Sequence, residues 1–172
     1  MSSEKKLKQR IKSISTEVIR LYHEAESQKK RVVSFTEEII AYEQILLRNL
    51  DSINDMVDKN MISDADGVLM INEISGGAKE YTNLMNRYSA WLQGDNEAAQ
   101  KLNQFEKENH ATPYTDAYHE GKLTLKEYVE KFESILAAYT PIANRVISSR
   151  SQLESFQNEF RQLTRKANSS VN

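Results

Sequence analysis

The stretch that decides the fold is residues 7–53, LKQRIKSISTEVIRLYHEAESQKKRVVSFTEEIIAYEQILLRNLDSI. Mostly apolar residues recur in it at alternating spacings of four and three, which is the heptad pattern of a helix that packs along one seam. The seam positions are Leu7, Ile11, Ile14, Val18, Leu21, Ala25, Gln28, Val32, Phe35, Ile39, Tyr42, Leu46, Asn49 and Ile53. No glycine or proline interrupts residues 4–60, so the pattern predicts one long helix over that range.

The apolar stripe of this helix widens along its length. Up to Gln28 it is a narrow seam, whereas from Phe35 onward further apolar residues flank it. A wider apolar face indicates more than one packing neighbour, so we expect the second half of the helix to enter a bundle. The flanking residues are Ile40, Ile45, Leu47, Leu50, Met56 and Val57.

Start and stop signals divide the middle of the chain. Ser63 or Asp64 can cap a helix predicted over 64–93. The pair Gly76 and Gly77 inside it predicts a kink or a close helix contact, and Gly94 predicts a left-handed helix end. Two shorter helices are predicted over 96–110 and 113–120.

The last helix, predicted over 125–168, has the clearest start signal. Thr124 and Glu127 have the spacing of a capping box, after Gly121. A heptad pattern follows, and because its phase continues through Pro141 we expect a kink there rather than a break.

Composition agrees with an all-α fold. The 172 residues include five glycines and two prolines, too few for the turns of a many-stranded fold. We therefore expect a single elongated module over 1–172, an antiparallel helical bundle or coiled coil with long first and last helices and shorter helices between them. In the simplest version the first and last helices pair antiparallel, with Ala25 opposite Ser149. The alternative is self-association, in which residues 7–53 form a parallel coil with a second copy.

Nothing in the sequence indicates catalysis. There is no cysteine, no HExxH, no GxSxG, no GxGxxG and no Walker A pattern, and His23, His110 and His119 form no metal-binding pair. We expect a non-enzymatic interaction protein, a scaffold, adaptor or assembly subunit, that uses no cofactor and no small-molecule substrate.

Two loops, residues 62–73 and 116–127, resemble degenerate EF-hands. Each has acidic residues at several ligand positions, glycine at the sixth position and glutamate at the twelfth, and each lacks one acidic ligand. Helix capping explains the same residues, so calcium binding is the less favoured hypothesis. The candidate metal ligands are Asp64, Asp66, Glu73, Asp116, Glu120 and Glu127.

Charge is distributed unevenly along the chain. Residues 1–31 carry nine basic and four acidic side chains, residues 122–172 carry eight and five, and residues 32–121 carry six and sixteen. In an antiparallel hairpin the two basic segments would meet in a positive tip, which predicts binding to an acidic protein partner and, less favoured, to an anionic membrane or nucleic acid. The candidate partner-binding residues are Lys5, Lys6, Lys8, Arg10, Lys12, Arg161, Arg165, Lys166 and, as an aromatic anchor at a helix end, Trp91.

The start of the chain is too polar for a secretory signal. The apolar runs are also far below the roughly 18 residues of a membrane span. We therefore expect a cytoplasmic protein, with delivery by a leaderless route left open.

Overall fold

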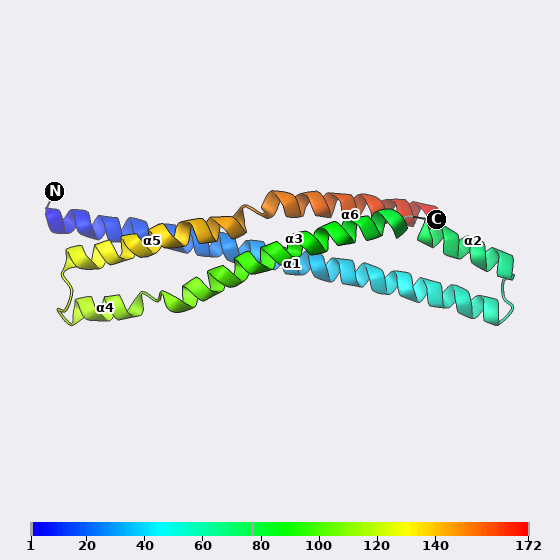
Figure 1. Ribbon diagram of the computed structural model, residues 1–172, viewed down its shortest axis with the longest axis horizontal. Helices are drawn as coiled ribbons and strands as arrows, with labels where there is room; N and C mark the ends of the chain where they lie inside the picture. Colours follow the sequence, from blue (N-terminus) through cyan, green and yellow to red (C-terminus); the bar gives the residue numbers. More distant parts are fainter. Residues whose placement is uncertain (1, 77, 172) are drawn as a thin grey trace. The chain divides into compact units, whose positions relative to one another are not determined.

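The computed structural model describes the backbone of residues 2–76 and 78–171 and side chains as far as Arg165. These residues form six helices and no strand, which confirms the all-α helical bundle (Figure 1). The helices are α1 (Ser3–Asp58), α2 (Asp64–Ser75), α3 (Ala78–Glu108), α4 (Thr112–His119), α5 (Leu125–Ile147) and α6 (Arg150–Val171).

The local signals act as the sequence predicts. The Ser63 hydroxyl accepts the N–H of Asp66 at the start of α2, and Thr124 and Glu127 form both hydrogen bonds of a capping box. Gly121 adopts a φ of 78°, which suits a residue without a side chain beyond Cα. Of the predicted α1 seam, Asn49 alone is exposed among the fourteen positions.

The middle of the chain differs from the prediction at both glycine sites. The helix is interrupted at Gly76, so α2 and α3 are separate helices rather than one kinked helix; Gly77 lies outside the described residues. Gly94 does not end a helix, because α3 continues through it to Glu108. The buried stripe of α3 continues past Gly94 to Leu102, and this packing outweighs the roughly 1 kcal/mol that a glycine costs inside a helix.

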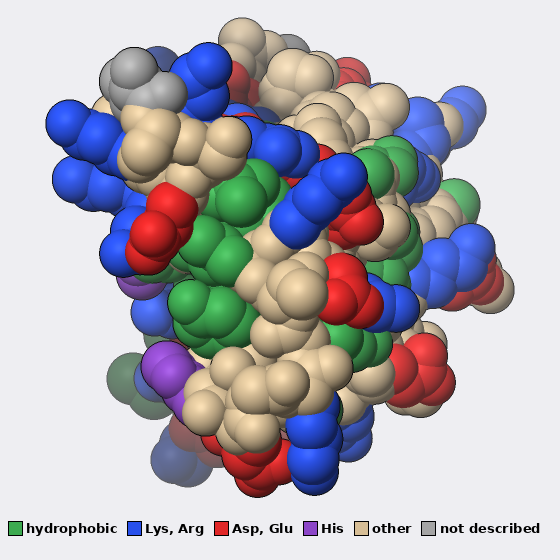
Figure 2. Space-filling view, turned by 90° about the vertical axis from the view of Figure 1, so that its left-hand side faces the viewer, with side chains coloured by type: hydrophobic (Ala, Val, Ile, Leu, Met, Phe, Trp, Pro, Cys, Tyr) green, Lys and Arg blue, Asp and Glu red, His purple; other side chains and the backbone are tan. Residues whose placement is uncertain are grey.

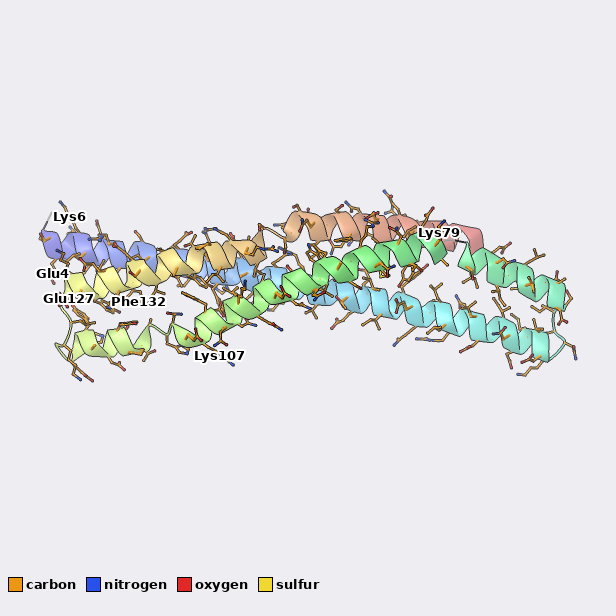
Figure 3. All side chains as sticks on the ribbon, in the orientation of Figure 1. Glu4, Lys6, Lys79, Lys107, Glu127 and Phe132 are labelled. Atoms are coloured by element: carbon orange, nitrogen blue, oxygen red, sulfur yellow. The ribbon has the colours of Figure 1, made fainter. Side chains whose placement is uncertain are left out.

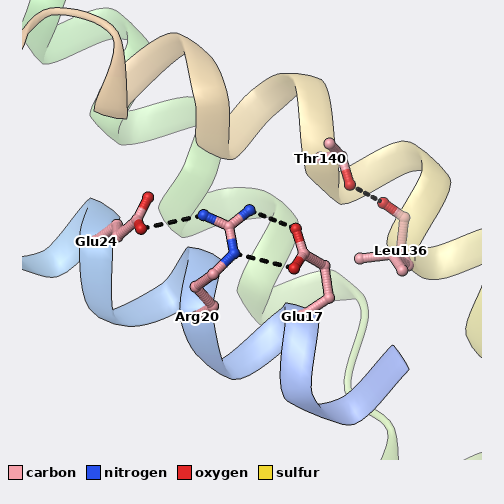
Figure 4. Close-up of polar contacts among 5 residues, drawn as sticks. All are labelled: Glu17, Arg20, Glu24, Leu136 and Thr140. Atoms are coloured by element: carbon pink, nitrogen blue, oxygen red, sulfur yellow. Dashed lines mark hydrogen bonds and ion pairs between the residues drawn. The ribbon is translucent and has the colours of Figure 1, made fainter. Parts of the chain in front are cut away.

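The last helix is also divided, although no break was predicted in it. Pro141 lies inside α5, which ends at Ile147, and the break falls at residues 148–149. Directly before the proline, the Thr140 hydroxyl donates to the carbonyl oxygen of Leu136 (2.7 Å; Figure 4). The break coincides with Ser149, a buried residue whose hydroxyl donates to the carbonyl of Val146.

The chain divides into two compact units. Unit 1 comprises Met1–Lys30 and Gln93–Arg150, and unit 2 comprises Arg31–Leu92 and Ser151–Asn172. Each unit contains part of α1, part of α3 and one of the two last helices, and each has its own core.

In unit 1, α1 and α5 run parallel. Arg10 of α1 bonds Glu133 of α5 (Nε to Oε1, 2.8 Å), and further along both helices Gln28 donates to the hydroxyl of Ser149 (3.1 Å). The predicted antiparallel pairing of the first and last helices, with Ala25 opposite Ser149, is therefore wrong. The core between the helices consists of Leu21, Ala25, Ala98, Leu102, Tyr139, Ala143 and Val146.

In unit 2, α3 runs antiparallel to both of its neighbours. Thr36 and Glu43 of α1 bond Tyr88 and Tyr81 of α3 in reversed order, and Arg87 and Trp91 of α3 bond Glu159 and Gln152 of α6 in reversed order. It follows that α1 and α6 are parallel here too. The core is rich in aromatic rings: Phe35, Tyr42, Tyr81, Tyr88, Trp91, Phe156 and Phe160.

Candidate interaction surface

Exposed large apolar side chains are concentrated in one part of unit 2. Ile19 and Tyr22 are the two such residues in unit 1, whereas from Ile71 to Leu163 no large aliphatic or aromatic side chain among the described residues is exposed. Single exposed apolar residues are normal, but a concentration of them marks an interaction site. The other eight lie between residues 33 and 70, and we call them the hairpin surface: Val33, Ile40, Ile45, Leu47, Met61, Val68, Leu69 and Met70.

The α2 helix carries apolar residues on its exposed side as well as on its buried side. Gly67 is buried, Ile71 and Ile74 are half-buried, and Val68 and Leu69 are 57% and 61% exposed. Side chains project from α2 both toward α1 and away from it (Figure 3). Apolar residues outside the buried side of a helix indicate a further packing neighbour, so the exposed apolar residues of α2 are the kind of surface that a partner covers.

The contact between α1 and α2 is close and its core is small. A β-carbon at Gly67 would clash with Cγ2 of Val57, so the two backbones approach closely there. Between residues 40 and 83 the buried residues are Ile53 and Gly67. Two helices alone therefore cannot hide the apolar residues that this segment carries.

The apolar residues of α1 in this segment form a line. Val33, Ile40 and Leu47 are spaced by seven, which places them on one side of the helix, away from the buried seam. Ile45 is exposed on another side of α1. The sequence predicted a wide apolar face here, and the structure leaves part of that face uncovered.

The same segment is acidic. Residues 43–75 carry seven acidic and two basic side chains, a formal charge of −5. One of these carboxylates, Asp55, forms an ion pair within the described residues, with Lys59 on the same helix (2.9 Å). Another, Glu43, accepts a hydrogen bond from the Tyr81 hydroxyl (2.6 Å). Burial raises the pKa of Tyr81, and this hydrogen bond raises it further. The other five are Asp51, Asp58, Asp64, Asp66 and Glu73.

The residues of the predicted positive tip are divided between the two units. Lys5, Lys6, Lys8, Arg10 and Lys12 belong to unit 1, whereas Arg161 and Arg165 belong to unit 2 on a helix that runs parallel to α1; the Lys166 side chain lies outside those described. Lys8 pairs with Glu4 (3.1 Å), and Arg10 pairs with Glu133. On the face of unit 1 that bears the start of α1, acidic and apolar side chains lie among the lysines and arginines (Figure 2).

Farther along α1 in unit 1, Arg20 is held within its own helix. It bonds Glu17 one turn before it and Glu24 one turn after it (Figure 4). The hydrogen bond from Arg20 lowers the pKa of the Glu17 carboxyl. These intrahelical pairs further reduce the positive charge that this segment offers to a partner.

Trp91 is not a free anchor. It lies between Tyr88 and Phe156, with ring centroids 5.7 and 5.6 Å away, and its Nε1–H donates to Gln152 (2.7 Å). The side chain is half-buried in the aromatic core of unit 2, so it stabilises this core.

The candidate metal ligands, including Asp116 of α4, lie in or beside α2, α4 and α5. In α2, Asp64 and Asp66 lie in the first turn and Glu73 two turns later on the same helix. In the second loop Glu120 pairs with Lys122, and Glu127 accepts the Thr124 backbone N–H, which lowers its pKa. Within the part of the chain described, no three His, Cys, Asp or Glu residues come together as a metal site.

Unit 1 contains a buried polar layer that the sequence indicated only through Gln28. Gln28, Asp95 and Ser149 are all buried, and Asp95 Oδ1 has no hydrogen-bond partner. Burial raises the pKa of Asp95, while Ser149 and the charge of Arg145 oppose the shift. The layer lies where α5 ends, and we find no arrangement in it that would do chemistry.

The exposed apolar residues of α2 were not predicted as a binding surface. The apolar run at residues 68–71 was the signal, because four consecutive apolar residues cannot all face one neighbour on a helix. Comparison with known proteins adds no information, since no protein-family model, curated protein or solved structure matches the chain. Over the described residues, no helix is both long and apolar enough to cross a membrane.

Proposed function

We propose that this chain is a non-enzymatic helical interaction protein, a scaffold, adaptor or subunit of a larger assembly, and that the hairpin surface is where it binds a protein. The observation that carries the proposal is that, of the ten large apolar side chains exposed among the described residues, eight lie within residues 33–70. Binding there removes the remaining apolar surface of α2 and of the α1 line from water.

The energetics support a surface of this size. Complete burial of a large aliphatic side chain stabilises a complex by about 1.5–3 kcal/mol, and these side chains are roughly half exposed before binding. Together they supply several kcal/mol, which is comparable with the lower estimates of what association costs.

A parallel coiled-coil dimer through residues 7–53 receives less support. The seam of that helix, including Leu21, Val32 and Phe35, is buried against other helices of the same chain. A dimer of that kind would have to displace these contacts.

Site-specific photo-crosslinking in the native host tests the proposal. A photoreactive residue at Leu69 should give one discrete crosslinked protein, and so should one at Leu47. The matched control is the same residue at Asn86, an exposed polar position of α3 in the same unit. Excess unlabelled protein should abolish the crosslink and excess Leu69→Gln protein should not. Equal crosslinking from Asn86, or none from Leu69 and Leu47, would show that the hairpin surface is not the binding site.

A further inference from the structure

The hairpin surface has chemical features that select its occupant, and its charge is the first. A second copy that docked the same surface on itself would bring two segments of charge −5 together around their apolar residues. Like charges at an interface oppose association, whereas opposite charges favour it. The complementary partner is therefore basic.

The positions of the carboxylates are the second feature. Asp51 follows Leu47 by four residues, and Glu73 follows Leu69 by four, so a carboxylate lies one helical turn from an exposed leucine on each helix. Leu47 and Leu69 are each 61% exposed, and neither carboxylate forms an ion pair within the described residues. If the partner has lysine or arginine one helical turn from the apolar residues that cover these leucines, its basic side chains will lie against the two carboxylates.

The arrangement of helices is the third feature. In unit 2, α6 packs beside α1 where Phe160 contacts Phe35 and Tyr42. The loop that joins α1 to α2 lies beyond the end of α6, so α6 does not run alongside this end of the α1–α2 pair (Figure 1). A helix is the element that packs most readily against two antiparallel helices with apolar residues between and beside them.

We propose that the α1–α2 end of unit 2 binds an amphipathic helix of a partner protein whose apolar stripe is bordered by lysine and arginine. This inference rests on the proposed function and names the partner's chemical class. The helix supplies apolar side chains at i, i+3, i+4 and i+7 to cover Leu47, Val68 and Leu69, and its cations meet Asp51 and Glu73.

The test uses the whole chain and three synthetic peptides of about 18 residues. The first is a leucine/lysine amphipathic helix, the second has the same leucines with glutamate in place of lysine, and the third is a scrambled leucine/lysine sequence. Fluorescence anisotropy should show saturable binding of the first peptide and at least roughly 10-fold weaker binding of the other two. Affinity for the first peptide should fall several-fold as salt rises from about 50 to about 300 mM, because the carboxylates are exposed.

Substitutions locate the site. Leu69→Gln should weaken binding of the first peptide roughly 10-fold, since burial of one leucine is lost. Ile19→Gln, which changes an equally exposed apolar residue of α1 in unit 1, should leave it unchanged. The pair Asp51→Asn and Glu73→Gln should weaken binding several-fold, and Glu97→Gln with Glu130→Gln, two exposed carboxylates of unit 1, should not. Circular dichroism melting of each variant confirms that the fold is retained.

The outcomes separate this inference from the proposed function. Equal binding of the glutamate peptide, or equal loss with Ile19→Gln, overturns the inference. Crosslinks from Leu69 in the native host, together with no binding of the lysine peptide, leave the proposed function standing and exclude a basic helix as the occupant. Light scattering that shows Leu69-dependent dimers, or vesicles of anionic lipid that bind as tightly as the peptide, would assign the surface to a second copy or to a membrane and overturn the inference as well.

Discussion

Unit 1 and unit 2 are built from parts of the same helices, and their cores and surfaces differ. The core of unit 1 contains three alanines, with a buried polar layer at Gln28, Asp95 and Ser149. The core of unit 2 is aromatic. Among the side chains that the structure describes, unit 1 exposes two large apolar ones and unit 2 exposes eight.

The comparison shows that a strong core and a covered surface are separate properties. Unit 2 has the bulkier core, with Phe35 in edge-to-face contact with Tyr88 and Phe160 (5.2 and 5.6 Å between ring centroids). Its apolar surface lies farther along, where α1 and α2 continue with little core between them. A stable support beside an uncovered apolar pair of helices is the arrangement expected of a binding surface.

Core truncations should have the largest effects and show how far the two units are coupled. Phe35→Ala removes a fully buried ring from unit 2 and should lower the free energy of unfolding by about 3–5 kcal/mol, and Leu102→Ala in unit 1 should cost about 2–5 kcal/mol. Hydrogen exchange should show faster exchange mainly in the unit that carries the substitution. A uniform increase along the chain would mean that the two units open together.

Two glycine substitutions should have opposite signs in the two units. Gly67→Ala places a methyl group against Val57 and should destabilise the α1–α2 pair by about 1–3 kcal/mol. Gly94→Ala adds a methyl group with no atom within 4 Å, inside α3, and should stabilise the protein by about 0.4–1 kcal/mol. Urea unfolding of both variants checks the signs, and a neutral Gly67→Ala would contradict the close contact of α1 with α2.

The polar layer of unit 1 should make stability depend on pH. Because burial raises the pKa of Asp95, the native state holds its proton more tightly than the unfolded state does. The ionised Asp95 carboxyl therefore lowers the free energy of unfolding at pH values above its pKa in the native state. This destabilisation disappears as the pH falls from that pKa to the pKa of the same group in the unfolded chain. Asp95→Asn should raise stability at neutral pH and flatten the fall in stability as pH rises from about 4, the ordinary pKa of an aspartate carboxyl, to neutral. Urea unfolding across that range measures it, and an unchanged slope would place the charge in water.

The exposed ion pairs should matter least. Arg87 binds both carboxylate oxygens of Glu159 in unit 2 (2.8 and 3.1 Å), and both side chains are nearly half exposed. Glu159→Gln should cost about 0.2–1 kcal/mol, as is usual for exposed pairs, and the same applies to Glu133→Gln, which breaks the Arg10 pair in unit 1. A double-mutant cycle at low and high salt checks both, and a loss above about 2 kcal/mol in either unit would show that the pair is desolvated.

Parts of the fold and of the candidate surface could be predicted from the sequence. The heptad seam predicted the buried side of α1, and the widening of that seam predicted apolar residues such as Ile40 and Leu47 beside it. The sequence did not show that these residues stay exposed, because exposure depends on where the neighbouring helices end. It also suggested, as a less favoured hypothesis, a metal site for which the described residues form no cluster of three His, Cys, Asp or Glu side chains, and a positive tip whose residues belong to different units.

By itself the sequence determined that the chain is helical, where α1 runs, and how α2 and α5 begin. These features depend on contacts between residues close in sequence. The Ser63 hydroxyl accepts the N–H of Asp66, three residues later, and Thr124 and Glu127 form a capping box. The tertiary structure alone decided that α1 is parallel to α5 and α6, that α3 passes through Gly94 while α5 ends near Ser149, and that α2 keeps an uncovered face. A heptad stripe has no direction, so the side-by-side packing of distant helices, which sums many small contacts, makes these choices.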